Sequence, residues 1–195
     1  MAFFDQAYKG NPPWDIGREQ KAFHKLAKKY DLLSPLLDIG CGTGENSLYF
    51  AKLGFSILGI DNSPTAIAKA NAKAEERNLQ DNAKFITYDL FNLIKFGRTF
   101  NTVIDCGVFH MFSKEARILY EKNIRNILAT NGMLFILAFS YKEPLGIGPN
   151  QRLLVEDYAE IFSSGWEIKS FQDEEFETNL RKNHAKALLT TIKRI

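Results

Sequence analysis

The sequence has few of the residues from which disulfide frameworks and metal centres are built. It holds two cysteines, Cys41 and Cys106, and three histidines, His24, His110 and His184, in 195 residues. Two cysteines cannot form a disulfide framework or a four-ligand zinc site, and the histidines lack the HxH or HxxxH spacing of metal ligands. We therefore expect no metal at the functional site.

An excess of charge of one sign and long apolar runs are also missing. The 25 Lys and Arg residues nearly balance the 23 Asp and Glu residues, whereas proteins that bind nucleic acid usually carry a clustered basic excess. The longest apolar run, from Met133 to Phe139, is far shorter than the roughly 20 residues that span a bilayer. The opening segment MAFFDQAYKG lacks the pattern of a secretory signal. We expect a cytoplasmic protein with no nucleic-acid or membrane partner.

Short β-type runs alternate with helical stretches along most of the chain. Strands are expected over 36–39, 55–60, 84–88, 99–105 and 133–139, and helices over 18–30, 45–52, 65–77, 115–128 and 153–162. This alternation is typical of right-handed βαβ units and a parallel sheet. A strand opening at Gly165 and a last strand over 187–192 have no helix between them and should pair antiparallel. The turn between them is expected at the acids Asp173, Glu174, Glu175 and Glu177.

The expected fold is an α/β, doubly wound, mostly parallel seven-stranded sheet. It carries an antiparallel C-terminal hairpin and an N-terminal lid helix. Residues 1–195 are expected to form one domain, because a domain averages about 150 residues. Within it, residues 1–33 would supply the lid segment and helix, and residues 34–195 the core.

A glycine-rich turn follows the first expected strand, in the sequence LLDIGCGTG from Leu36 to Gly44. Glycine lets the backbone turn tightly and come close to a ligand. The helix that follows directs free amide groups into the same crevice. Asp61 ends the next strand, where a carboxylate can accept hydrogen bonds from both hydroxyls of a ribose. The pattern predicts a nucleoside-binding site.

The spacing of this turn disfavours a dinucleotide. Dinucleotide-binding enzymes use G-x-G-x-x-G, whereas this chain has G-x-G-x-G with Glu45 in the sixth place. Glu45 would repel a pyrophosphate, and Asp38 before the first glycine suits a cationic ligand. S-adenosylmethionine fits, since it joins an ammonium and a sulfonium to an adenosine. A turn that binds no ligand, and a nicotinamide oxidoreductase, remain as alternatives.

The segment LLDIGCGTGENSLYFAKLGFSILGIDNSPTAIAKA resembles the first two motifs of the class I S-adenosylmethionine-dependent methyltransferases nearly residue for residue. The resemblance implies a Rossmann-like sheet, and S-adenosylhomocysteine as the product. It implies that Asp61 holds the ribose. Residues implied to contact the methionine part are Asp38, Gly40, Cys41, Gly42 and Gly44. Those implied near the adenine are Asn62, Ser63, Asp89 and Leu90, and those over the sulfonium are Cys106, Gly107 and Val108.

The segment PPWDIGR, from Pro12 to Arg18, is similar to the W-D-x-G-R segment of the thiol, halide and thiopurine S-methyltransferases. It is similar more loosely to the tellurite-resistance methyltransferases. That group folds an N-terminal helix over the cofactor, which implies that Trp14 packs near the bound methionine chain with Arg18 close by. An ordinary aromatic plug under the helix is the alternative for Trp14.

The overlapping segment NPPW, from Asn11 to Trp14, resembles the N/D-P-P-Y/F/W motif of DNA and protein amide methyltransferases. In those enzymes the motif usually follows the fourth strand. Here the fourth strand is followed by DCGVFH, from Asp105 to His110, and the chain has no room for a target-recognition domain. We therefore expect a small-molecule acceptor.

The acceptor decides whether a base is needed. A thiol, selenide or halide is nucleophilic once it is anionic, so alignment in a dry pocket suffices. An oxygen or nitrogen acceptor would more often require a base, and His110 is the candidate, with a packed histidine as the alternative. The segment 143–150 is a candidate lid. Residues expected to bind the acceptor at the strand ends are Phe109, His110, Phe139 and Tyr141.

The sequence thus predicts an S-adenosylmethionine-dependent methyltransferase that acts on a small molecule, at sulfur or another soft nucleophile. One alternative is a small-molecule O- or N-methyltransferase with His110 as base. Another is a noncatalytic protein that binds S-adenosylmethionine. The protein is expected to be a monomer or a homodimer.

Overall fold

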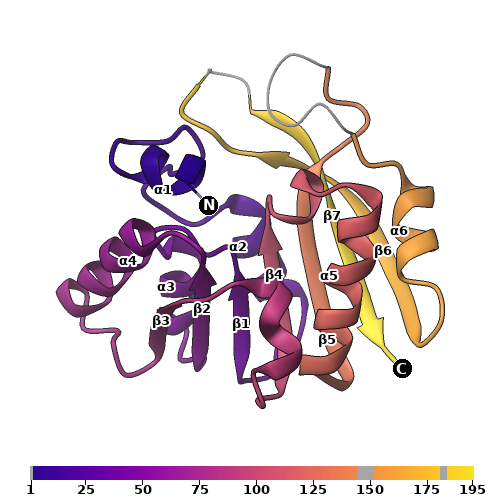
Figure 1. Ribbon diagram of the computed structural model, residues 1–195, viewed down its shortest axis with the longest axis horizontal. Helices are drawn as coiled ribbons and strands as arrows, with labels where there is room; N and C mark the ends of the chain where they lie inside the picture. Colours follow the sequence, from indigo (N-terminus) through magenta and orange to yellow (C-terminus); the bar gives the residue numbers. More distant parts are fainter. Residues whose placement is uncertain (1, 145–151, 181–183) are drawn as a thin grey trace.

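A computed structural model describes residues 2–144, 152–180 and 184–195 (Figure 1). Within them seven strands form one sheet in the order β3-β2-β1-β4-β5-β7-β6. The strands are β1 (Leu36–Ile39), β2 (Ile57–Asp61), β3 (Ala83–Thr87), β4 (Phe100–Cys106), β5 (Leu128–Phe139), β6 (Trp166–Phe176) and β7 (Ala185–Arg194). The first five are parallel, and β7 runs antiparallel to both β5 and β6. The expected doubly wound sheet with its C-terminal hairpin is confirmed.

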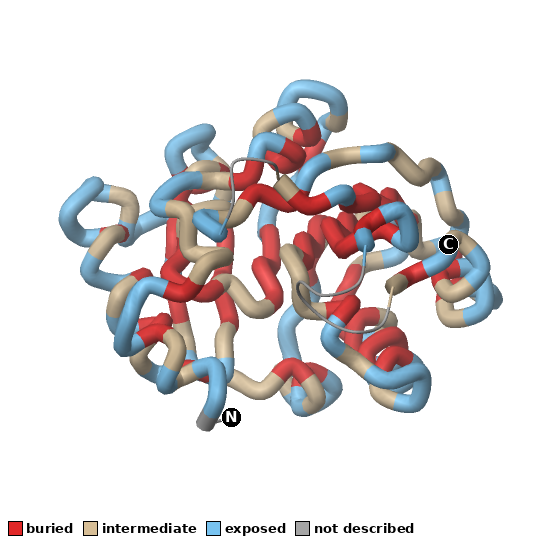
Figure 2. The backbone as a smooth tube through the Cα atoms, turned by 90° about the horizontal axis from the view of Figure 1, so that it is seen from above, coloured by how far each residue is buried: buried red, intermediate tan, exposed pale blue. Residues whose placement is uncertain are grey.

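Helices cover both faces of this sheet (Figure 1). One face packs against α2 (Lys21–Lys29), α3 (Glu45–Lys52) and α4 (Pro64–Glu76), and the other against η1 (Leu90–Lys95), α5 (Lys114–Ile127) and α6 (Val155–Ile161). Neighbouring residues of one strand serve opposite faces, because side chains alternate along a strand. Leu36 joins the first cluster and Leu37 the second. Figure 2 shows the buried segments toward the middle of the molecule and mostly exposed loops around its outside.

A local capping signal places the start of α4. The hydroxyl of Ser63 accepts a hydrogen bond from the Ala66 amide at 3.1 Å, and Pro64 occupies the first helical position of α4. A capping side chain satisfies an amide that has no partner within the helix, and proline has no amide to satisfy. The predicted start of this helix is therefore correct to within one residue.

Two expectations for the strands of the C-terminal half of the chain were wrong. β5 begins at Leu128, which pairs with Phe100, and the residues between it and Met133 bulge out of the ladder, with Asn131 at a φ of 66°. The expected acidic turn is also strand: 173–175 lie within β6, paired to β7. Because β6 is an edge strand, its acids can face solvent and surface lysines, which suits an edge that must not aggregate.

The N-terminal region differs most from expectation. The helix expected over 18–30 is α2, which begins only at Lys21 and buries Ala22, Phe23 and Leu26 in the core. The helix beside the cavity described below is instead α1 (Ala2–Tyr8), which contacts α4 (Figure 1). A second short turn, η2 (Phe109–Met111), follows β4. No helix in the described ranges is long and apolar enough to cross a membrane.

Candidate active site

A cavity of about 490 Å³ lies at the carboxyl ends of the parallel strands. This volume is within the range of small-molecule sites, and open α/β sheets bind ligands at this edge, where the strand order reverses. The turns after β1, β2 and β4 form its floor. Further walls come from α1, from the segment 13–20, which we call the strap, and from Phe176 at the end of β6 with Thr178 and Leu180 beyond it.

The turn after β1 adopts a conformation that favours glycine. Gly40 and Gly42 have φ values of 63° and 54°, a region that other residues rarely occupy. A Cβ at Gly40 would collide with the Val108 side chain, and one at Gly42 would lie 2.5 Å from the Tyr8 hydroxyl. The bare backbone therefore lets the β4 turn and α1 close in on the β1 turn.

Asp61 binds the glycine turn to the start of α4. Its carboxylate accepts hydrogen bonds from the Gly42 amide at 3.0 Å and from the Ser63 amide at 2.8 Å. Burial raises the pKa of this carboxyl above its usual value. Each oxygen keeps a further lone pair, and Asp61 lines the cavity. It can therefore accept hydrogen bonds from two more hydroxyls.

Two further buried acids stand behind the floor. Asp38 accepts a hydrogen bond from the Ser47 hydroxyl at 2.6 Å, while its Oδ1 has no partner among the described residues. Asp105 accepts hydrogen bonds from the Val108 amide and the Tyr120 hydroxyl, both at 2.9 Å. Burial raises their pKa values, to about 7 for Asp38 and about 6 for Asp105. A cation in the cavity would favour the charged form of these acids, so the site fits a sulfonium nucleoside.

Most residues predicted from the sequence line this cavity. They are Trp14, Arg18, Gly40, Cys41, Gly42, Asp61, Asn62, Leu90, Cys106, Gly107, Val108, His110 and Phe139. Burial raises the pKa of both cysteine thiols well above the usual value, so neither is a thiolate at neutral pH. The structure thus brings the predicted set together without making either cysteine a nucleophile.

Other predicted residues lie away from the cavity lining. They are Asp38, Gly44, Ser63, Asp89, Phe109 and Tyr141. Asp38 stands behind the floor. The side where Gly44 would carry a Cβ faces Phe85, and Ser63 and Asp89 cap α4 and η1. Phe109 is fully buried in the core, and Tyr141 is nearly half exposed. Of the candidate lid 143–150, residues 145–150 lie outside the described residues.

His110 is held by one of its two ring nitrogens. The Phe139 amide donates a hydrogen bond to Nδ1 at 3.0 Å, so the proton of the neutral ring sits on Nε2. The residue is 5% exposed and lines the cavity. Burial, with Arg152 and Arg117 nearby, lowers its pKa to about 3. The ring is therefore uncharged at neutral pH.

The comparisons with known proteins agree with this geometry. A family of methyltransferase domains matches residues 36–132. The chain is 31% identical over 174 residues to a 2-heptyl-1-hydroxyquinolin-4(1H)-one methyltransferase of Mycobacteroides abscessus, and the match covers 85% of this chain and 76% of that protein. This chain belongs to the class I S-adenosylmethionine-dependent methyltransferases.

Two further proteins are similar to this methyltransferase over most of their own length. A probable thiol methyltransferase 2 of Arabidopsis thaliana is 27% identical over 179 residues, which is 91% of this chain and 78% of that protein. A solved structure from work on the conversion of a disulfide bond into a thioacetal group during echinomycin biosynthesis has a TM-score of 0.88 and 29% identity. That match covers 99% of this chain and 92% of the other.

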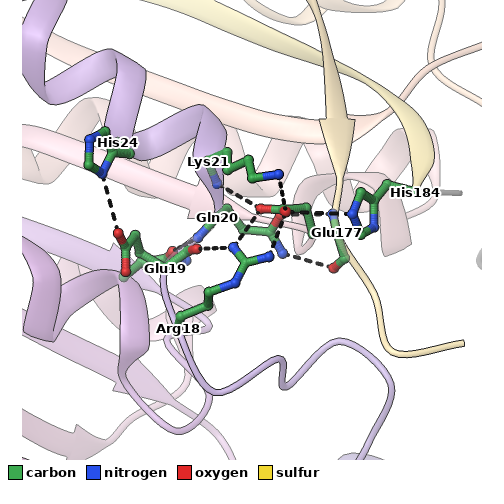
Figure 3. A network of polar contacts seen from close by, with 8 residues as sticks. Arg18, Glu19, Gln20, Lys21, His24, Glu177 and His184 are labelled. Atoms are coloured by element: carbon green, nitrogen blue, oxygen red, sulfur yellow. Dashed lines mark hydrogen bonds and ion pairs between the residues drawn. The ribbon is translucent and has the colours of Figure 1, made fainter. Parts of the chain in front are cut away.

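The strap of the methyltransferase is tied down by Glu177, just beyond β6 (Figure 3). Arg18 donates to both carboxylate oxygens of Glu177, at 2.7 and 2.9 Å, and the Lys21 amide donates at 2.9 Å. The Gln20 side chain also exchanges hydrogen bonds with the Glu177 backbone, at 2.8 and 3.0 Å. The Glu177 side chain is 1% exposed, and Arg18 lowers its pKa to about 2. Arg18, which was predicted from the sequence to lie close to the cofactor, thus pairs with the carboxylate of Glu177.

Sequence reasoning missed the walls that α1 and the end of β6 supply. They include Phe4, Tyr8, Phe176, Thr178 and Leu180. Phe4 and Tyr8 are spaced i, i+4, which puts two aromatic rings on one face of a helix. Both rings pack edge-on against Trp14. That spacing was the available signal for α1, whereas nothing local points to the residues after β6.

Replacement of Gly42 by alanine is expected to weaken S-adenosylhomocysteine binding about tenfold. The new Cβ would push Tyr8 away and would hold a positive φ, at a cost of roughly 1–2 kcal/mol. Isothermal titration calorimetry measures the change. Gly54→Ala is the matched control, because Gly54 has a φ of 92° and nothing within 4 Å of the added carbon. Wild-type affinity in Gly42→Ala would contradict the expected contact.

Proposed function

We propose that the enzyme methylates a small acceptor that ionises without a general base from the protein, at sulfur or another soft nucleophile or, as a second candidate, at an acidic hydroxyl. This proposal rests on the hydrogen bonds and ion pairs that hold the acids lining the cavity. Asp15 accepts a hydrogen bond from Thr43, Glu45 pairs with Lys73 and Arg77, and Asp61 is held by two amides. Groups held in this way make poor general bases. A thiol suits such a site because it ionises near neutral pH.

The remaining walls favour an acceptor with an uncharged apolar body. We assign to the acceptor side the lining residues Trp14, Met111, Phe112, Phe139 and Phe176. Aromatic and apolar walls exclude water, which strengthens electrostatic interactions with the reacting groups. Alignment in such a pocket can supply about 7–11 kcal/mol of the barrier.

The floor of the cavity would hold S-adenosylmethionine. In this proposal Asp61 accepts the ribose hydroxyls, the 40–42 turn faces the methionine part, and Leu90 lies on the adenine side. When bound, S-adenosylmethionine supplies the methyl group and a sulfonium leaving group. The protein's own contribution is to orient the two substrates, to exclude water and to offset charge.

The relatives support two acceptor classes. A thiol acceptor is supported by the Arabidopsis thaliana relative, named a probable thiol methyltransferase. An acidic hydroxyl is the second candidate, because the relative from Mycobacteroides abscessus is named for a 1-hydroxyquinolone. Both groups ionise more readily than an aliphatic alcohol.

The test measures S-adenosylhomocysteine formation with thiophenol, an alkanethiol, 2-heptyl-1-hydroxyquinolin-4(1H)-one, an aliphatic alcohol and an amine. We expect turnover with thiophenol or the hydroxyquinolone, rising with pH as the acceptor ionises, and none with the alcohol. Turnover with the amine or the alcohol alone would overturn the proposal. The relative rates of S-adenosylhomocysteine formation with thiophenol and with the hydroxyquinolone decide between a thiol and an acidic hydroxyl as the acceptor.

A further inference from the structure

One ring nitrogen of His110 accepts a hydrogen bond, and the other carries a proton that the ring can donate. Because Nδ1 accepts the Phe139 amide hydrogen bond at 3.0 Å, a neutral ring must carry its proton on Nε2. Phe139 ends β5, and His110 lies in the η2 turn after β4. Two neighbouring parallel strands therefore fix this tautomer.

The surroundings of the ring keep it in this orientation. Phe139 packs edge-on against it with ring centroids 4.9 Å apart, and the Phe176 ring lies 6.0 Å away. On another side is Gly107, where an added Cβ would lie 3.5 Å from the imidazole Cε1. A ring flip would also leave the Phe139 amide without its acceptor, which buried amides rarely tolerate. The ring is thus held in one orientation at the cavity that His110 lines.

The charges near His110 disfavour a second proton on the ring. The two that act on it are the guanidinium groups of Arg117, on α5, and Arg152, beside Phe139. The nearer packing partners, Phe139 and Phe176, do not titrate. Nδ1 therefore stays an acceptor and Nε2 a donor across the pH range in which thiols and acidic hydroxyls ionise.

We propose that the Nε2–H of His110 donates a hydrogen bond to the ionised acceptor atom, so that His110 acts as a hydrogen-bond donor and not as a general base. This inference rests on the proposed function and narrows its substrate class. The acceptor is an uncharged, planar apolar molecule that carries one thiol or acidic hydroxyl. A carboxylate on its body would need a cation, and Arg18, the one Lys or Arg among the described residues of the lining, is already paired with Glu177.

The chemical step balances without a protein base. The acceptor O–H or S–H releases its proton to solvent on ionising, and the hydrogen bond from Nε2 favours that anion. A lone pair of the anion then forms the bond to the methyl carbon. The bond between that carbon and the sulfonium sulfur breaks, and its electron pair stays on sulfur, which gives S-adenosylhomocysteine. His110 keeps its proton throughout.

Two substitutions of similar shape separate the acceptor role of Nδ1 from the donor role of Nε2. In His110→Asn the amide oxygen can take the place of Nδ1 and accept the Phe139 amide, while the cavity donor is lost. In His110→Gln the amide nitrogen reaches the place of Nε2 and restores the donor, while the Phe139 amide loses its acceptor. The thermal unfolding temperature and the affinity for S-adenosylhomocysteine are measured for each variant.

With thiophenol and the hydroxyquinolone as acceptors, we expect His110→Asn to lose at least tenfold in kcat/KM with an unfolding temperature close to wild type. His110→Gln should keep the larger share of kcat/KM despite a lower unfolding temperature, and all three pH profiles should share one shape. A general base would make both variants equally inactive and remove an ionisation from the profile. A purely structural role would make activity follow unfolding temperature. Either result overturns the proposal.

A readout that needs no turnover separates this inference from the proposed function. 4-Nitrophenol changes colour on ionising, so its ionisation can be followed when it is bound to the enzyme–S-adenosylhomocysteine complex. Its midpoint pH should be lower in wild type and His110→Gln than in His110→Asn. Equal midpoints, or no binding to wild type, overturn the donor role. A shifted midpoint without turnover of any acceptor would instead overturn the proposed function alone.

Discussion

Asp61→Asn is expected to weaken binding of S-adenosylhomocysteine about 100-fold. The substitution removes the charge that strengthens hydrogen bonds from two ribose hydroxyls, each worth roughly 1.5–3 kcal/mol. It also turns an amide NH₂ toward either the Gly42 or the Ser63 amide, each of which now donates to a carboxylate oxygen. Two donors would then face each other in the floor of the cavity. Isothermal titration calorimetry gives the affinity directly.

The matched control for this experiment is Asp81→Asn. Asp81 is an exposed acid before β3, so its replacement makes the same chemical change away from the cavity. It should leave the affinity within twofold of wild type. If Asp61→Asn also bound with wild-type affinity while remaining folded, the assignment of Asp61 to the ribose would be wrong.

Arg18→Met is expected to lower the free energy of unfolding by about 3 kcal/mol at pH 7. The Glu177 carboxylate is buried, and loss of its bidentate partner leaves a poorly compensated charge. Lys21 remains 3.4 Å from it, through a side chain that is mostly exposed, and compensates only in part. Urea denaturation measures the change. A loss below 0.5 kcal/mol would show that the strap does not depend on this pair.

The double variant Arg18→Met/Glu177→Gln identifies the cause. It should recover part of the stability, because it no longer buries an unpaired charge. The pair also has a defined pH window. The folded-state pKa of Glu177, about 2, lies below the ordinary 4.5, so its stabilising effect is full above pH 4.5 and is lost as the pH falls toward 2. The stability difference between wild type and Glu177→Gln should disappear over that interval.

Elements with strong local signals could be predicted closely from the sequence. The helix over 45–52 has the expected bounds, and Ser63 and Pro64 begin α4 as a cap and a first-turn proline should. The helix α1 has only the i, i+4 spacing of Phe4 and Tyr8 as a local signal, and so short a helix depends on tertiary contacts. It is held by Asp5, which accepts a hydrogen bond from the Ser63 hydroxyl at 2.7 Å.

The acids of β6 show a second limit to what can be predicted from the sequence. A run of charged residues reads as a turn when the sheet around it is unknown. On an edge strand the same residues can stay paired while they face solvent, as Asp173 does toward Lys142. Composition alone does not say which strand is at the edge.

The contact between the glycine turn and Asp61 could be predicted from the sequence, whereas the orientation of more distant side chains could not. The glycine turn and Asp61 belong to one local motif, and the structure joins them by a hydrogen bond at 3.0 Å. Which of Phe109 and His110 faces the cavity depends on the turn of η2, which the sequence does not specify. The proton position on His110 depends on Phe139, in another strand. Contacts of this kind follow from the fold, not from local pattern.

The contribution of both chain ends to the cavity has a consequence for how the enzyme is made. The segment that matches the methyltransferase family, 36–132, carries the glycine turn, Asp61 and His110. It lacks Phe139, which sets the His110 proton, and Glu177, which holds the strap. During synthesis the glycine turn and Asp61 are therefore made well before Phe139 and Glu177. Nucleoside binding by nascent chains should begin only after β6 has emerged, so ligand capture reports that the chain has been made past Glu177.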